Sequence, residues 1–152
     1  MIRKATRGDE GILAAQNRAM ALETEGKELD LERSLRGVAA VLEDPGKGFY
    51  LVAEREGQVV GQLMVTFEWS DWRNGTFWWI QSVYVAPAAR RSGVYRGLYE
   101  RLLAMAREDG GVCGIRLYVE AENGRAQATY AALGMERARY ELFEVDFVFG
   151  SS

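Results

Sequence analysis

The sequence contains no histidine, one cysteine and two prolines. The missing histidine excludes a Ser-His-Asp triad, a Cys-His pair and an ordinary zinc site, because each of these needs an imidazole. We therefore expect no metal in the protein. The single cysteine, Cys113, cannot form an intrachain disulfide, which fits a reducing compartment, and we expect its side chain to act as a small buried hydrophobe.

The chain also lacks long apolar runs and a basic face. No run is long enough to span a bilayer, and the residues after Met1 are charged rather than the apolar core of a leader. The 19 basic and 22 acidic residues are interleaved and leave a formal net charge of -3. This balance disfavours nucleic-acid binding. We expect a cytoplasmic protein that binds neither membranes nor nucleic acids.

A length of 152 residues with 48% apolar and 27% charged side chains is typical of one globular domain, here 1–152. Apolar spacing predicts a strand at 2–5, a helix beginning at a capping box over 6–9, and a second helix after Asp30. One helix face is expected to carry Ile12, Ala15, Ala19 and Leu22. The second is expected to carry Leu31, Leu35, Val38 and Leu42.

The second half of the chain predicts a β-rich region with two further helices. Strands are expected at 49–54, 59–69, 76–85, 115–119 and 140–149. A helix is expected from Val94 to the Gly110-Gly111 pair, and another at 123–133. The strand–helix–strand crossover between 76 and 119 predicts a parallel pair, and the earlier hairpins predict antiparallel pairs. The fold class is therefore α/β with a mixed sheet.

The segment 83–98 joins a strand to the beginning of a helix through a short loop. Free N–H groups and a partial positive charge at a helix N-terminus favour anions, and Gly93 allows close approach of a ligand. Arg90, Arg91 and Arg96 add positive charge. The residues alone leave two interpretations open: a pyrophosphate site, or an ordinary helix start with solvated arginines.

Two motifs resemble those of the GNAT superfamily of N-acetyltransferases. Val85-x-Pro87-x-x-Arg90-x-x-Gly93-x-Tyr95 is similar to its R/Q-x-x-G-x-G/A signature, with Tyr95 where the family usually has Gly or Ala. Asn123-x-x-Ala126-x-x-x-Tyr130-x-x-Leu133-Gly134 is similar to its second acyl-CoA motif. The segment 69–79 resembles a bacterial branch of the superfamily whose acceptors are mostly undefined.

The resemblance implies a twisted, mostly antiparallel sheet of six to seven strands, flanked by about four helices and containing a splayed parallel pair. It implies acetyl-CoA as co-substrate, with pantetheine along the backbone of Val83 and Val85. The expected pyrophosphate ligands are the backbone amides of Arg91, Ser92, Gly93, Val94, Tyr95 and Arg96. Asn123, as helix cap or ligand, and Ala126 are expected at the cofactor.

The same resemblance implies Tyr130 as the general acid for the departing thiolate. A base, if one is needed, would be a carboxylate acting through water, either Glu68 or one of Glu23 and Glu25, which lie in the expected acceptor-side loop. Trp79 and Gln81 are further acceptor-side candidates. The aromatic residues at 67–79 are open to two interpretations, core filling or a lining for the acceptor or a dimer contact, but Trp78 and Trp79 must face opposite sides of the sheet.

The sequence therefore predicts an acetyl-CoA-dependent N-acetyltransferase that acts on a primary amine of a small molecule or peptide. Direct attack is expected, because the chain offers no paired nucleophile for a covalent acyl-enzyme. The alternatives are a catalytically inactive acyl-CoA-binding regulatory or interaction domain and a nucleotide-binding protein unrelated to CoA. A homodimer is a further expectation.

Overall fold

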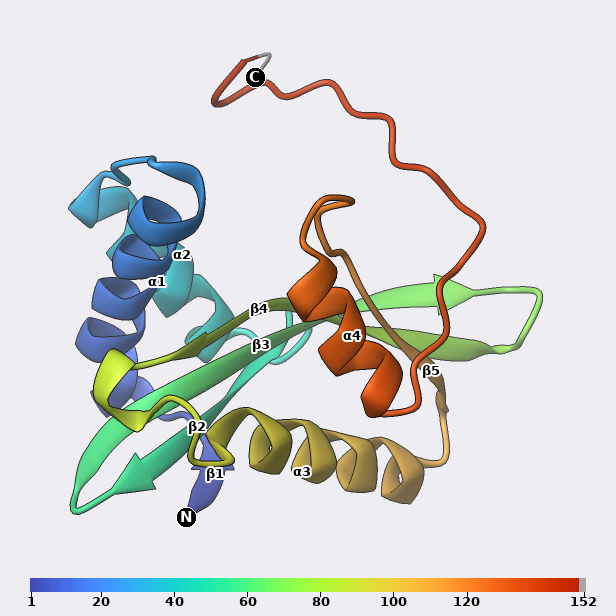
Figure 1. The fold of residues 1–152 in the computed structure, drawn as a ribbon, viewed down its shortest axis with the longest axis horizontal. Helices are drawn as coiled ribbons and strands as arrows, with labels where there is room; N and C mark the ends of the chain where they lie inside the picture. Colours follow the sequence, from blue (N-terminus) through green and yellow to red (C-terminus); the bar gives the residue numbers. More distant parts are fainter. Residues whose placement is uncertain (151–152) are drawn as a thin grey trace. The chain divides into compact units, whose positions relative to one another are not determined.

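The computed structural model describes residues 1–150, which fall into two compact units, Met1–Tyr118 and the residues from Val119 onward. The prediction of one domain over 1–152 stays a prediction. In chain order the first unit contains β1 (Ile2–Lys4), a 3-10 turn (Arg7–Asp9), α1 (Glu10–Glu25), α2 (Leu31–Glu43), β2 (Phe49–Arg55), β3 (Gln58–Ser70), β4 (Gly75–Val85), a second 3-10 turn (Pro87–Ala89), α3 (Val94–Asp109) and β5 (Val112–Leu117) (Figure 1).

The first unit is built on a five-stranded sheet in the order β1-β2-β3-β4-β5. The first three pairings are antiparallel and the β4–β5 pairing is parallel, which confirms the predicted mixed sheet. The last of these strands begins at Val112, earlier than the predicted 115, because the chain leaves α3 at Gly110 in the left-handed conformation and enters the sheet almost at once.

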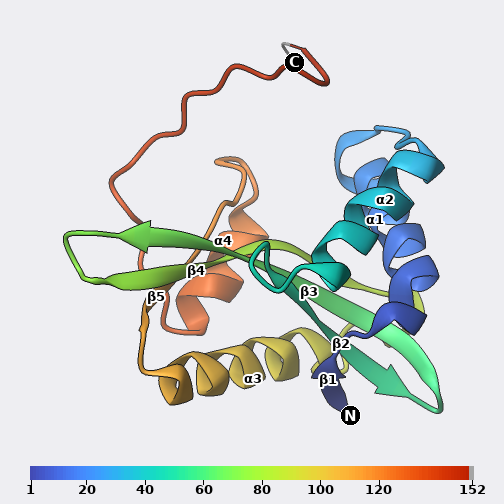
Figure 2. The same cartoon turned by 180° about the vertical axis from the view of Figure 1, so that it is seen from behind.

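Helices cover both faces of this sheet. Figure 1 shows α1 and α2 against one face, and Figure 2 shows the same unit from behind, with α3 along the opposite face. The core under α1 and α2 contains Leu13, Ala14, Val38, Tyr50 and Val52. On the other face, a Cβ atom at Gly61 would lie 2.7 Å from Val94 Cγ1. Glycine at this point in β3 is therefore what allows α3 to approach the sheet closely.

The face that α1 buries differs from the prediction. Leu13, Ala14 and Ala21 are buried, whereas Ile12 and Leu22 are exposed. The difference arises because a polar residue occupies the buried stripe: Gln16 accepts a hydrogen bond from Gln62 of β3 at 2.9 Å and donates to the Val59 carbonyl at 3.1 Å. The apolar face of α2 is as predicted at Val38, and Asp30 caps this helix through the Arg33 N–H at 2.8 Å.

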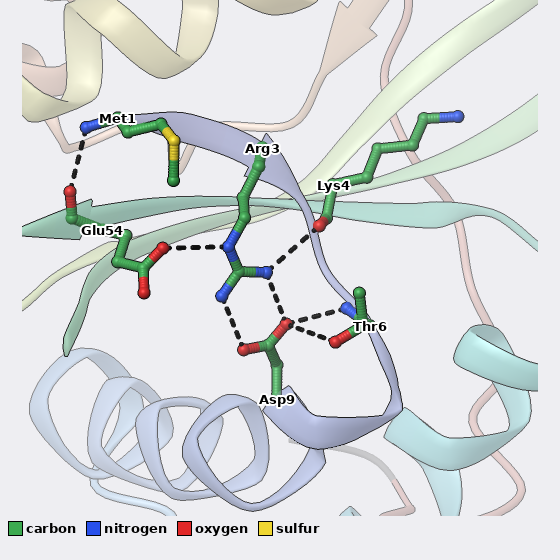
Figure 3. Close-up of polar contacts among 6 residues, drawn as sticks. All are labelled: Met1, Arg3, Lys4, Thr6, Asp9 and Glu54. Carbon is green, nitrogen blue, oxygen red and sulfur yellow. Dashed lines mark hydrogen bonds and ion pairs between the residues drawn. The ribbon is translucent and has the colours of Figure 1, made fainter. Parts of the chain in front are cut away.

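A cluster of charges fixes the beginning of the chain to the sheet (Figure 3). Arg3 donates two hydrogen bonds to Asp9, at 2.8 and 3.0 Å, and a third to Glu54 of β2 at 3.1 Å. Asp9 also accepts from the Thr6 N–H at 2.7 Å, as the capping spacing predicts. The hydrogen bonds from Arg3 are the main reason why the pKa of Asp9 lies below its ordinary value.

β4 pairs differently with its two neighbours. Its pairing with β3 continues to Gly61↔Val85, but its pairing with β5 ends at Ile80↔Leu117. The register with β3 also shifts, since Val65 lies opposite Ile80 and Met64 lies opposite Ser82, which leaves Gln81 as the extra residue of a β-bulge. Within the described residues, the ladder of β4 therefore continues along Ser82–Val85 on the β3 side alone.

The second unit contains α4 (Gly124–Ala132). Asn123 caps this helix by accepting from the Ala126 N–H at 3.1 Å, and Gly134 follows it with φ 92°. The predicted strand at 140–149 is wrong: these residues have no regular secondary structure, so the described sheet has five strands rather than six or seven. Alternation alone does not supply a neighbouring strand, and Asp146 instead accepts from the backbone N–H groups of Val148 and Phe149 at 2.8 and 3.0 Å, which bends the chain.

No helix within residues 1–150 is long and apolar enough to cross a membrane.

Candidate functional site

The loop between β4 and α3 presents backbone N–H groups at a helix N-terminus. Arg91 has φ 63° and Gly93, the residue before α3, has φ 83° and ψ 8°, so two left-handed residues shape the turn. The first N–H groups of an α-helix have no carbonyl partner within the helix and carry a partial positive charge. This geometry can hold a phosphate or pyrophosphate group, because successive backbone N–H groups in such turns converge on an anion.

Two side-chain contacts hold this loop in place. Arg55, at the end of β2, donates to Ser92 Oγ at 2.9 Å and to the Ser92 carbonyl at 3.2 Å, and Ser92 Oγ itself donates to the Ala89 carbonyl. Arg90 donates to the Val85 carbonyl at 2.9 Å and to Glu23 of α1 at 2.8 Å. The loop is thus attached to the β2–β3 hairpin on one side and to α1 on the other.

The separation of β4 from β5 places a strand edge directly before this loop. Beyond Ile80, the backbone of β4 keeps its ladder with β3 but not with β5. A strand edge of this kind can pair with an extended, amide-bearing ligand in the manner of an added strand. Val83 and Val85 lie on this stretch, although the Val85 carbonyl already accepts a hydrogen bond from Arg90.

A polar and aromatic cluster occupies the α1 face of the sheet on the other side of the bulge. Glu68 Oε1 accepts from the Trp79 indole at 3.0 Å and from Arg116 at 3.1 Å. The Trp79 ring stacks on Tyr118, with 4.5 Å between ring centroids. Gln81, the bulged residue, donates to Thr66 Oγ1 at 2.8 Å. Glu68, Trp79 and Gln81 are therefore neighbours, as their candidacy for one acceptor side requires.

Trp78 lies on the opposite side of the sheet from Trp79. Its ring contacts Phe49 at 5.2 Å and Phe67 at 6.3 Å between centroids, and its side chain is buried. The prediction that the two tryptophans have different roles is confirmed, because one fills the core and the other joins the polar cluster around Glu68.

A small cavity lies next to Glu68, between the tip of the β3–β4 hairpin and Arg116. Its volume is about 160 Å³, which is smaller than the roughly 300 Å³ at which small-molecule sites begin. It is lined by Glu68, Trp69, Ser70, Asp71, Trp72, Arg73, Phe77 and Arg116. A cavity of this size suits one functional group of a ligand rather than a whole cofactor.

The sequence profile of the Acetyltransferase (GNAT) family matches residues 14–135. The chain belongs to the GNAT acetyltransferase family. The chain is 44% identical to a possible acetyltransferase from Clostridium difficile 630, with 97% of each chain covered and a TM-score of 0.92. No curated protein matches the chain significantly.

Two more distantly related structures share the fold of the present chain. A ribosomal-protein-alanine N-acetyltransferase from Brucella melitensis biovar Abortus 2308 is 16% identical, with 97% of this chain and 99% of that chain covered and a TM-score of 0.76. An aminoglycoside antibiotic 6'-N-acetyltransferase from Acinetobacter haemolyticus is also 16% identical, with the same coverage and a TM-score of 0.74. At this identity the likeness establishes the fold alone.

The structure of the present chain brings together most of the predicted residues of the first motif. Those from Val83 to Arg96 lie on one strand end, one loop and the first turn of α3, with Glu23 beside them through Arg90. Val94 is the exception in character, since its side chain is buried in the core and only its backbone can serve a ligand. Residues of the second motif lie in the second unit, where Asn123 is a helix cap, and Ala126 and Tyr130 are partly buried residues of α4.

Sequence reasoning missed three side chains that organise this part of the acetyltransferase. Arg55 holds Ser92, Arg116 holds Glu68, and Tyr84 lies against Glu23 with 3.4 Å between Tyr84 Oη and Glu23 Oε1. Burial first, and the Glu23 carboxylate second, raise the pKa of Tyr84. Arg116 carries a recognisable signal, because it is the only charge in the otherwise apolar strand Val112–Leu117.

Proposed function

We propose that this acetyltransferase moves the acetyl group of acetyl-CoA to a primary amine of a small molecule or peptide by direct attack. The observation that carries the proposal is the sequence of features along β4: a strand edge without a β5 partner beyond Ile80, followed at once by the loop with left-handed Arg91 and Gly93 and the N-terminus of α3. The first feature fits the two amides of pantetheine, and the second fits a pyrophosphate.

The chain's own residues divide the work of binding acetyl-CoA. Backbone amides from Arg91 to Arg96 receive the pyrophosphate, with the Arg91 and Arg96 side chains adding charge. Tyr95 contributes its N–H, which needs no particular side chain. The backbone of Val83 and Val85 receives the pantetheine arm. Asn123 and Ala126 remain candidates for cofactor binding on the second motif alone. Binding a polyanion on fixed amides requires no reorganisation of the loop.

Acetyl transfer then combines three events at the thioester. An amine nitrogen attacks the thioester carbonyl carbon, a backbone N–H of the β4 edge polarises the carbonyl oxygen, and the C–S bond breaks as the thiolate leaves. Tyr130 donates its hydroxyl proton to that thiolate. A thiol has a pKa of about 8.5 and a tyrosine of about 10, so the thiolate is already a fair leaving group and the contribution of Tyr130 is modest.

The acceptor side is formed by Glu68, Trp79 and Gln81 on the sheet and by Glu25 at the end of α1. Glu68 is the candidate base, acting on the amine through water, and Arg116 and Trp79 fix its carboxylate. Of the acidic groups near the α1–α2 loop, two already have partners in the fold, since Glu23 is paired with Arg90 and Asp30 caps α2. Negative charge for a cationic acceptor therefore comes from the other carboxylates near this loop, Glu25 and Glu28, which are exposed.

The test is a two-step measurement on the full chain. Isothermal titration is expected to show saturable binding of acetyl-CoA, and a thiol-release assay with a panel of amines is expected to show turnover for at least one class of acceptor. Binding without turnover across a wide panel would instead support an inactive acyl-CoA-binding regulatory domain. A thermal shift with ATP or NAD but none with acetyl-CoA would contradict both.

A further inference from the structure

Arg90 has three partners, two at the end of β4 and one in α1. Its Nε donates to the Val85 carbonyl at 2.9 Å, one terminal nitrogen donates to Glu23 Oε2 at 2.8 Å, and its guanidinium lies 5.6 Å from the centroid of the Tyr84 ring. Tyr84 in turn donates to Glu23 Oε1 at 3.4 Å. Both carboxylate oxygens of Glu23 are thus engaged, one by Tyr84 at the end of β4 and the other by Arg90 in the loop that follows this strand.

This arrangement separates Glu23 from the role that its position in the chain suggests. Glu23 lies in the last turn of α1, beside the acceptor-side loop, but its carboxylate points to the residue that begins the pyrophosphate loop. A carboxylate that holds a guanidinium and a phenol has little left to offer an incoming ammonium group. The structure therefore gives Glu23 a partner in the cofactor site instead of in the acceptor site.

Arg90 is well placed to set the position of the loop. It directly precedes the amides from Arg91 onward, and its guanidinium bridges the last carbonyl of β4 and the last turn of α1. Arg55 holds the loop at Ser92, two residues further along. With Glu23 in place, the loop is held at two points; without it, Arg90 keeps only the carbonyl and the ring, and the loop must be ordered when the ligand binds.

We propose that Glu23 is a positioning residue for acetyl-CoA, which acts through Arg90 to hold the pyrophosphate loop in its binding conformation and makes no contact with the acceptor amine. The inference rests on the proposed function and assigns Glu23 to the cofactor half of the site. It predicts that the loss of Glu23 has no further effect on acetyl-CoA binding once Arg90 has been replaced, because Glu23 acts only through Arg90.

The expected effect is small, because the pair is partly solvated. The side chains of Arg90 and Glu23 are 45% and 41% exposed. Ion pairs at this exposure change an equilibrium by about 2–5-fold. Glu23→Gln is therefore expected to weaken acetyl-CoA binding about 2–5-fold, to raise the KM for acetyl-CoA by the same factor, and to leave kcat and the KM for the amine unchanged.

The experiment is a double-mutant cycle on the full chain, read by titration with acetyl-CoA and by steady-state kinetics. The variants are Glu23→Gln, Arg90→Gln and the two together. The matched control is Glu32→Gln, which removes another exposed ion pair, Glu32–Arg36 at 3.0 Å, on the outer side of α2. The double variant is expected to bind acetyl-CoA no more weakly than Arg90→Gln alone, and the control is expected to bind like the wild type.

Each other outcome identifies a different error. A raised KM for the amine with unchanged acetyl-CoA affinity in Glu23→Gln would make Glu23 an acceptor-binding residue and overturn the proposal. Additive effects of the two substitutions, or a Glu23→Gln variant that behaves like Glu32→Gln, would also overturn it. If the wild type itself fails to bind acetyl-CoA, the proposed function falls first and the proposal falls with it.

Discussion

Replacing Gly93 by alanine is a clean perturbation of the proposed pyrophosphate loop. Gly93 has φ 83°, and a Cβ atom at this position would meet no heavy atom within 4 Å. The substitution therefore introduces no clash and removes no side-chain contact. What it adds is the cost of holding an L-residue in the left-handed conformation, about 1–2 kcal/mol.

The same helix supplies a matched control at its other end. Gly110 follows α3 with φ 79°, and a Cβ atom there would also meet nothing within 4 Å. Gly110→Ala is expected to lower the free energy of unfolding by the full penalty of about 1–2 kcal/mol, because the helix end fixes its conformation. Gly93→Ala can avoid part of this penalty, because a loop residue can leave the left-handed region when no ligand is bound.

In that relaxed state the N–H groups of the loop no longer converge, and acetyl-CoA must restore them on binding. We therefore expect Gly93→Ala to divide the penalty between a smaller loss of stability and a weaker affinity for acetyl-CoA, up to about 5–30-fold. Urea denaturation and titration calorimetry on the wild type and both variants measure the two parts. Wild-type affinity in Gly93→Ala, or an equal loss of affinity in Gly110→Ala, would refute the assignment of this loop.

Three further substitutions test other parts of the reasoning. Tyr130→Phe is expected to lower kcat for acetyl transfer about 10²-fold with KM values near wild type, because only proton donation to the thiolate is lost; an unchanged kcat excludes Tyr130 as the acid. Glu68→Gln is expected to lower kcat about 10²-fold if Glu68 is the base, whereas a loss of stability with normal turnover would make it a support for Arg116. Asp9→Asn is expected to lower the free energy of unfolding by about 1.5–3 kcal/mol at pH 7, because it removes a charge-assisted bond to Arg3. The pKa of Asp9 is lowered from 3.8 in the fold, so the wild type has this contribution above that pH and loses it as the pH falls through the lower folded value. Urea denaturation at pH 7 and pH 3 should show the difference between wild type and Asp9→Asn shrinking in acid, and a constant difference would contradict the linkage.

Features set by neighbours in the chain could be predicted from the sequence. The cap at Asp30, the capping spacing of Thr6 and Asp9, and the change from strand to helix around Gly93 depend on a few adjacent residues. The loop of the first motif is recognisable for the same reason. Its backbone chemistry follows from the strand–loop–helix transition alone, whatever the rest of the fold does.

Contacts between distant segments could not be predicted in this way. The pairs Arg55–Ser92, Glu68–Arg116 and Glu23–Arg90 join residues 37, 48 and 67 positions apart. Which side chains meet depends on strand register, on the bulge in β4 and on which face α1 buries, and none of these follows from local spacing. The misassigned face of α1 has the same origin, since the reason for burying Gln16 lies in Gln62 on another strand.

The bulge at Gln81 changes the side of the sheet to which the later residues of β4 point. Side chains alternate along a strand, so without an extra residue Ile80 and Tyr84 would share one side of the sheet. With it, Ile80 lies in register with Val65 and Tyr84 lies in register with Gln62, on the side where α1 supplies Glu23. Deleting one residue at this point would turn each side chain of β4 from Ser82 onward to the opposite side of the sheet. One extra amino acid therefore decides that even-numbered side chains of β4 face one side of the sheet before the bulge and the opposite side after it.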